Sequence, residues 1–131
     1  MKIVEKLDHE IQQRSNISLT DYEILSTLMS SASKRVRMSE LAAKVLVSRS
    51  RLTYRVDRLV DAGLLGREEC SDDRRGLWAI LTVAGEQTFL QAKAGHEQDI
   101  RTWFLDHLDP QETETLKSIT NRISDKLDSN R

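Results

Sequence analysis

The sequence predicts a mainly α-helical fold with one small antiparallel β-hairpin. Apolar residues recur at helical spacing along most of the 131-residue chain, and two short strand-like stretches flank a charged turn at residues 71–76. A composition of 38% hydrophobic and 31% charged residues fits a helix-rich globular protein. This length suits one domain, in which folding buries about two thirds of the unfolded surface. We therefore expect a single domain over residues 1–131.

The first two helices are marked by apolar stripes and by a capping signal. Residues 2–14 form an amphipathic helix, which ends at residues 15–18. Its apolar face carries Ile3, Val4, Leu7 and Ile11. Thr20 and Glu23 have the spacing of a capping box, which predicts Thr20 as the N-cap of the second helix. That helix ends in a polar loop at residues 30–35, and its inward residues are Tyr22, Leu25, Leu28 and Met29.

A helix-turn-helix is predicted in the centre of the chain. Ser39 is the expected N-cap of the first helix, whose stripe is Met38, Leu41, Ala42 and Val45. Ser48 is the expected N-cap of the second helix, which runs to Ala62 and stops at Gly63, a residue type typical after a helix end. Its buried face is predicted to hold Leu52, Val56, Leu59 and Val60.

A hairpin follows these helices. Residues 64–70 and 77–82 are predicted strands of about six residues, and the turn-forming segment 71–76 joins them. Helix, turn, helix and hairpin in this order predict a winged helix-turn-helix.

Two helical patterns complete the chain. The first runs from Val83 to about Leu108, with Gly95 as a position where the helix can bend. Asp109 and Pro110 then mark the start of the last helix. Its apolar stripe consists of Leu116, Ile119, Ile123 and Leu127.

The apolar stripes of the terminal helices predict a dimer, because each stripe needs a surface to pack on. We expect the residues of the last stripe, together with Ile3, Leu7 and Ile11, to pack mainly on a second copy of the chain. The winged helix then spans residues 20–82 approximately. The dimerisation helices span residues 2–14 and 83–128 approximately.

Charge is unevenly distributed along the chain. The net charge is −1, but residues 34–75 carry 11 Lys or Arg against 7 Asp or Glu, and both flanks are acidic. A basic centre between acidic flanks is typical of a nucleic-acid reader on an acidic frame. The alternative is an ordinary solvated surface, so the motifs have to decide.

The second helix of the helix-turn-helix has the polar residues that a major-groove reader needs. An α-helix fits the major groove, and its N-terminal residues reach base edges. Arginine pairs with guanine or phosphate, and hydroxyl groups bond to phosphates or bases. The candidate DNA contacts are Ser48, Arg49, Ser50, Arg51, Thr53, Tyr54 and Arg58. The alternative is a surface helix whose arginines pair with Asp57 and Asp61.

The turn of the hairpin carries two further arginines. Arg74 and Arg75 are candidates for insertion into a narrow minor groove, where the negative potential is enhanced. Asp73 can orient a neighbouring arginine. The alternative is a solvated charged turn.

Residues 19–127 resemble the MarR family of winged-helix transcription regulators. The matching segments are residues 19–25, 38–42, 48–53, 56–59, 63–67, 73–76 and 81–85. The resemblance implies that Arg75 enters the minor groove and that Asp73 positions it. It also implies a homodimer, built by the terminal helices, on a pseudo-palindromic site in double-stranded DNA. Members commonly repress, and many release DNA when a small aromatic or anionic molecule enters a cleft between the reader and the dimer region.

One departure from the family concerns the first helix. Members usually carry a longer helix before the segment that matches Leu19 to Leu25, whereas 18 residues precede Leu19 here. The completeness of the dimer contact and of the ligand cleft depends on this helix.

Residues that could support other functions are few. Cys70, the single cysteine, suits a reducing compartment, and we expect an inert thiol, with a redox sensor as the alternative. His9, His96 and His107 lack metal-ligand spacing, so neither a metal nor a cofactor is expected.

No catalytic motif is present, which predicts a protein that is not an enzyme. A winged helix that binds protein through an exposed apolar patch remains the alternative to DNA binding.

Neither a membrane span nor a signal peptide is expected. No apolar run approaches the roughly 20 residues that a membrane helix needs, and charges interrupt the N-terminal apolar positions. Together with the single cysteine, this predicts a cytoplasmic protein.

Overall fold

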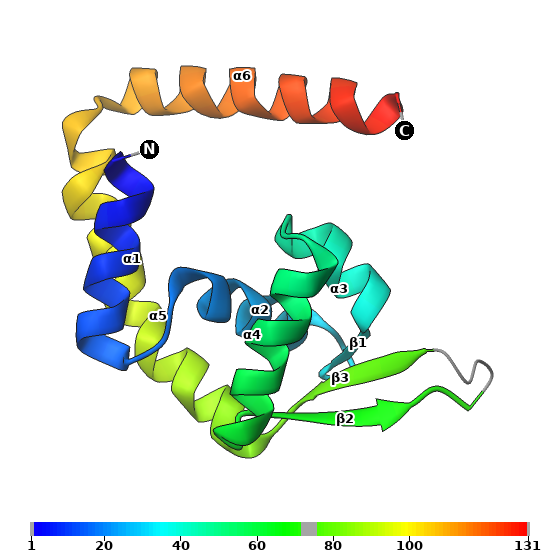
Figure 1. The fold of residues 1–131 in the computed structure, drawn as a ribbon. Coiled ribbons are helices and arrows are strands. Elements are labelled where there is room, and N and C mark those ends of the chain that lie inside the picture. The colour runs from blue at the N-terminus through cyan, green and yellow to red at the C-terminus, as the bar shows by residue number, and fades with distance from the viewer. Residues whose placement is uncertain (1, 72–75, 131) are drawn as a thin grey trace.

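The computed structural model describes residues 2–71 and 76–130 and has the predicted order of elements (Figure 1). Four helices and one strand precede the hairpin: α1 (Lys2–Ser15), α2 (Leu19–Ser30), β1 (Arg35–Arg37), α3 (Met38–Val45) and α4 (Arg49–Asp61). The hairpin and the C-terminal helices are β2 (Leu65–Glu69), β3 (Leu77–Leu81), α5 (Val83–Trp103), η1 (Leu105–His107) and α6 (Pro110–Ser129). The winged helix-turn-helix is therefore confirmed.

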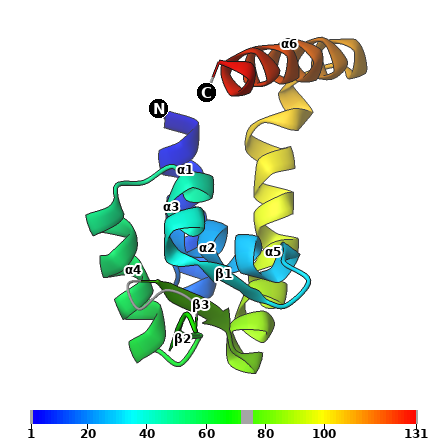
Figure 2. The ribbon, with the colours of Figure 1, turned by 90° about the vertical axis from the view of Figure 1, so that its right-hand side faces the viewer.

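The C-terminal helix α6 and the sheet occupy opposite ends of the molecule. Helices α1 and α5 lie side by side, and α6 crosses the end where α5 finishes (Figures 1 and 2). The sheet lies at the opposite end, next to α2, α3 and α4. The sheet and the helices beside it are thus well separated from α6.

The sheet has three antiparallel strands in the order β1-β3-β2, so the expectation of a two-stranded hairpin was incomplete. Part of the expected polar loop forms β1, in which Val36 pairs with Ala79 of β3. Both residues are buried. Because β1 has three residues and one apolar side chain, alternation could not reveal it.

Two of the four predicted N-caps are confirmed and two are wrong. The side chains of Ser48 and Asp109 accept hydrogen bonds from the backbone N–H groups of Arg51 and Glu112. The cap of α2 is Ser18 rather than Thr20. Helix α3 begins one residue before Ser39 and has no side-chain cap.

The core brings together side chains from α1 to α5 and all three strands. Its fully buried members include Leu25, Leu41 and Leu52. Ile11 is also fully buried in this core (0% exposed), which corrects its assignment to a dimer interface. Leu7 and Ile3, one and two turns earlier in α1, are half-buried.

Helix α5 ends at Trp103, earlier than expected, and Gly95 lies inside it. A Cβ at Gly95 would lie 2.5 Å from Nη1 of Arg14, so glycine here makes room for the arginine side chain of α1. Arg14 donates hydrogen bonds of 2.9 and 2.8 Å to the two carboxylate oxygens of Asp99. This two-pronged ion pair holds α1 against α5.

A buried histidine lies next to this ion pair. His96 is 7% exposed and packs on the ring of Tyr22, with the ring centroids 4.5 Å apart. Its Nδ1 has no hydrogen-bond partner within the described part of the chain. Burial lowers the pKa of His96 below its usual value, and nearby Arg14 lowers it further against the opposing effect of Asp99.

We expect His96 to make the fold less stable at low pH. Because its pKa is lower in the folded than in the unfolded chain, the unfolded chain binds the proton first as pH falls through about 6.5. The free energy of unfolding should therefore fall from pH 7.5 to pH 5, and the pH dependence should be weaker in His96→Phe. Urea denaturation at several pH values measures both. Equal pH dependence in the parent and the variant would contradict this expectation, and His107→Phe, at an exposed site, is the control.

Candidate nucleic-acid interface

Helix α4 presents a polar face to solvent at the edge of the molecule (Figure 2). Leu52, Val56 and Leu59 are buried and hold the other side of α4 against the core, as predicted. We define the groove-reading face as the exposed residues on the outer side, namely Ser50, Arg51, Tyr54 and Arg58. At about 100° per residue these residues share one face of the helix.

The arginines of α4 do not form ion pairs with the carboxylates of the same helix. Arg49, Arg51 and Arg58 are exposed, and none forms an ion pair within residues 2–71 and 76–130. Asp57 pairs instead with Arg67 of β2. This contact neutralises a carboxylate beside the exposed arginines and ties α4 to the hairpin.

The hydroxyl groups at the start of α4 also bond to the helix itself. Ser48 Oγ accepts from the backbone N–H of Arg51 at 3.2 Å and lies 3.3 Å from Ser50 Oγ. Thr53 Oγ1 donates to the carbonyl oxygen of Arg49 at 2.9 Å. Tyr54 is 56% exposed, so its hydroxyl and ring are accessible.

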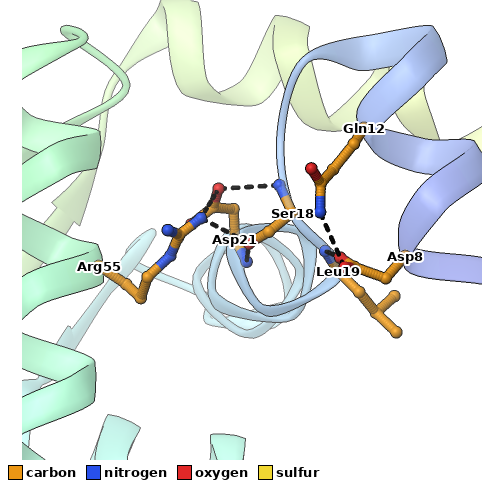
Figure 3. Close-up of polar contacts among 6 residues, drawn as sticks. All are labelled: Asp8, Gln12, Ser18, Leu19, Asp21 and Arg55. Carbon is orange, nitrogen blue, oxygen red and sulfur yellow. Dashed lines mark hydrogen bonds and ion pairs between the residues drawn. The ribbon is translucent and has the colours of Figure 1, made fainter. Parts of the chain in front are cut away.

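One arginine of α4 was absent from the predicted site and has a different environment. Arg55 lies between the groove-reading face and the buried side of α4, and it bonds to Asp21 and Ser18 at the N-terminus of α2 (Figure 3). Its position three residues after Leu52 and four before Leu59, both buried, was a signal for this orientation.

The hairpin is regular up to the limits of the described residues. Strands β2 and β3 pair from Leu65 opposite Leu81 to Glu69 opposite Leu77. The backbone N–H of Cys70 donates to the carbonyl oxygen of Gly76 at 2.9 Å and extends the pairing. The predicted wing residues, Asp73, Arg74 and Arg75, lie outside the described residues.

A tryptophan between two arginines lies on the outer face of the sheet. The guanidinium carbons of Arg35 and Arg37 lie 4.3 and 5.2 Å from the ring centroid of Trp78. Arg35 also pairs with Glu68 of β2 at 3.8 Å. These contacts stiffen the root of the hairpin, because they connect all three strands on one face.

A cleft of about 590 Å³ separates α1 from the start of α2 and α4. Its lining includes Asp8 and Gln12 of α1, Glu23 of α2, and Arg51 and Arg55 of α4. Burial raises the pKa of Glu23. Arg51 therefore belongs to both the groove-reading face and the cleft.

Helix α6 has an apolar face that is largely exposed to solvent. Leu116, Ile119, Ile123 and Leu127 are 41, 39, 54 and 63% exposed. Trp103 and Phe104, at the end of α5, are also exposed, and Lys6 Nζ lies 4.6 Å from the centroid of the Trp103 ring. These six exposed apolar residues thus belong to α6 and to the end of α5, which lie opposite the sheet (Figure 1).

The other candidate residues do not assemble into a site. Cys70 is buried, at 5% exposed, which limits its access to oxidants. His9 and His107 are exposed, and the described residues contain no group of three His, Cys, Asp or Glu side chains that could hold a metal ion. Over the same residues, no helix is long and apolar enough to cross a membrane.

Comparison with known proteins identifies close relatives of this fold. The model of the MarR family matches residues 15–76. Sco3205 of Streptomyces coelicolor, a MarR family transcriptional regulator solved in complex with DNA, is 32% identical with a TM-score of 0.89, and the match covers 96% of this chain and 79% of Sco3205. AbsC of the same organism, also a MarR family regulator, is 34% identical with a TM-score of 0.87, covering 98% of this chain and 86% of AbsC. The regulator PecS of Dickeya dadantii (strain 3937) is 25% identical over 130 residues, which are 98% of this chain and 78% of PecS.

Proposed function

The chain belongs to the MarR family of transcriptional regulators, and on this premise we propose that it is a homodimeric repressor of a pseudo-palindromic operator. The observation that carries the proposal is the groove-reading face of a well-capped helix, whose exposed arginines pair with no carboxylate of residues 2–71 and 76–130. The DNA complex of Sco3205 supports the same reading. Because these relatives are regulators, we propose no catalytic activity for the chain.

In this proposal α4 enters the major groove. Arg51 bonds to a base edge, most favourably the O6 and N7 atoms of guanine, and Arg49 and Arg58 bond to phosphates. Ser48, Ser50, Thr53 and Tyr54 complete the contact with hydroxyl groups. The pairing of Asp57 with Arg67 supports this placement because it lowers the repulsion between a carboxylate and the DNA.

The wing contacts the neighbouring minor groove. We propose that Arg75 inserts into this minor groove, that Asp73 orients the Arg75 side chain, and that Arg74 bonds to a phosphate of the DNA backbone. The regular pairing of β2 with β3 supports this role, since it continues to Glu69 opposite Leu77 and so forms a two-stranded base for a wing.

We further propose that residues 20–82 form the DNA reader and that residues 2–14 and 83–128 form the dimer region. The exposed stripe of α6 supports this division because four large apolar side chains at helical spacing are 39–63% exposed. In a twofold dimer the two groove-reading helices lie about 34–36 Å apart, one turn of DNA.

A small aromatic or anionic effector would fit the cleft beside α1. Since Arg51 lines this cleft, a ligand that pairs with it there competes with the DNA for the same guanidinium. Fluorescence anisotropy with labelled palindromic DNA, measured with and without a small aromatic carboxylate, checks this competition.

Salt dependence tests the proposed function. Each phosphate neutralised by Lys or Arg contributes a slope of about −0.9 to the logarithm of affinity against the logarithm of salt concentration. With six or more phosphate contacts per dimer, we expect affinity to fall about 1,000-fold between 50 and 200 mM salt. Fluorescence anisotropy with labelled palindromic fragments measures it. Binding that is independent of salt, or absent for every fragment, would refute DNA recognition.

A further inference from the structure

Arg55 is the one arginine of α4 whose side chain turns toward the protein. It is 24% exposed and extends to the N-terminus of α2, where it meets two residues (Figure 3). Its Nε donates to Asp21 Oδ1 at 2.9 Å, and its Nη2 donates to Asp21 Oδ2 at 2.6 Å and to Ser18 Oγ at 2.7 Å. This contact fixes both the position and the plane of the guanidinium group.

The group that receives Arg55 is itself held in place by the backbone of α2. Asp21 Oδ2 accepts from the backbone N–H of Ser18 at 2.9 Å, and Ser18 Oγ accepts from the backbone N–H of Asp21 at 3.0 Å. The two residues therefore form a capping box, and Arg55 binds its outer side. A carboxylate with this many fixed partners cannot move without uncapping the helix.

Helix α1 supports the same helix start. Asp8 Oδ1 accepts from the backbone N–H of Leu19 at 2.8 Å, while Asp8 Oδ2 accepts from Nε2 of Gln12 at 2.8 Å (Figure 3). The end of α2 that holds Arg55 is thus attached to α1 as well as to its own cap.

Burial keeps Arg55 in this contact when α4 binds DNA. The side chain of Asp21 is 9% exposed, so departure of the arginine would leave a buried carboxylate without its cation. Within residues 2–71 and 76–130, the exposed Arg51 and Arg58 on the same helix form no ion pair. A phosphate would therefore recruit those two side chains before it could extract Arg55.

We propose that Arg55 is a positioning residue, which fixes the rotation and depth of α4 in the major groove through Asp21. The proposal rests on the proposed function and deepens it, since it names a specificity determinant that does not touch DNA. The groove-reading face makes base contacts only when α4 has the right orientation, whereas contacts with phosphates tolerate small rotations.

Asp21→Asn gives the sharpest test, because positioning and simple electrostatics predict opposite signs. Removing a negative charge should strengthen DNA binding if charge alone matters. If Asp21 holds Arg55, the same change weakens operator binding about tenfold, within the range of coupled pairs, and leaves binding to random DNA unchanged. The matched control is Asp61→Asn, which removes a carboxylate from the exposed side of α4 and should bind operator at least as tightly as the parent.

Arg55→Gln separates positioning from a direct phosphate contact. We expect the same loss of operator binding as in Asp21→Asn with an unchanged salt slope, whereas Arg58→Gln should make the salt slope shallower by about one unit per protomer. The double variant should be no weaker than either single variant, because both changes break one contact. Arg55→Lys keeps a cation beside Asp21 but not the two-pronged contact, so it provides the same readout if the other variants fail to fold.

The outcomes are distinguishable from failure of the proposed function. A parent protein that binds no DNA refutes the function itself. A parent that binds, with Asp21→Asn matching Asp61→Asn or with a shallower salt slope in Arg55→Gln, overturns the positioning role and leaves the function intact. Weaker operator binding in Asp21→Asn and Arg55→Gln at unchanged slope, without additivity, supports it.

Discussion

Replacing Ile123 by glutamate should give a monomer that loses operator binding by about 100-fold or more. Ile123 lies in the middle of the exposed stripe of α6, between Ile119 and Leu127. A carboxylate there would have to be buried against the second copy without a partner, at a cost that a helix–helix interface cannot recover. A monomer presents one α4 instead of two, and loss of the second contact forfeits an avidity gain of about 10²–10⁴.

Sedimentation and operator binding measure the two halves of this expectation. Asn121→Glu introduces the same charge on the opposite side of α6 and should remain a dimer with parental affinity. An Ile123→Glu protein that sediments as a dimer would refute the α6 interface. A monomer that binds operator as tightly as the parent would refute the need for two copies.

Arg51→Ala and Arg75→Ala should have the next largest effects, and the two effects should differ in kind. A bidentate arginine–guanine contact discriminates by about 1–3 kcal/mol, so Arg51→Ala should weaken binding about 10- to 100-fold and relax sequence preference at one position of each half-site. Arg75→Ala should weaken binding by about tenfold, with most effect on sites with a narrow minor groove. The Arg51 side chain is exposed, so Arg51→Ala should retain the fold.

Operator variants carrying each base at each position would measure these changes. Arg122→Ala, an exposed arginine on α6, is the matched control and should match the parent. If both variants bound like the parent on every sequence, the placement of the reader on α4 and the wing would be wrong.

The elements that the sequence predicted well are helices with a long apolar stripe and a capping residue at the helix start. Ser48 and Asp109 were identified as caps because each precedes a periodic apolar segment. Thr20 was predicted as the cap of α2 from Glu23 three positions later, but Ser18 has the same spacing to Asp21. Only the backbone conformation, extended at Ser18, distinguishes the two.

The features that escaped prediction depend on contacts between distant segments. Strand β1 is defined by its pairing with β3, more than 40 residues later. Arg55 was grouped with no site, since its link to Asp21 crosses 34 positions of sequence. Ile11 and Ile123 lie in apolar stripes of the same periodicity. Only the structure shows that Ile11 is buried in the core, where α1 packs on α5, whereas Ile123 is exposed.

Selection of bound DNA from a random pool tests the central claim most directly. Two copies of α4 related by a twofold axis should select a pseudo-palindrome whose half-site centres lie about 10 base pairs apart. Arg51→Ala should yield the same spacing with one degenerate position in each half-site. Enrichment of a single unrepeated half-site, or of no sequence at all, would contradict a dimeric reader built on α4.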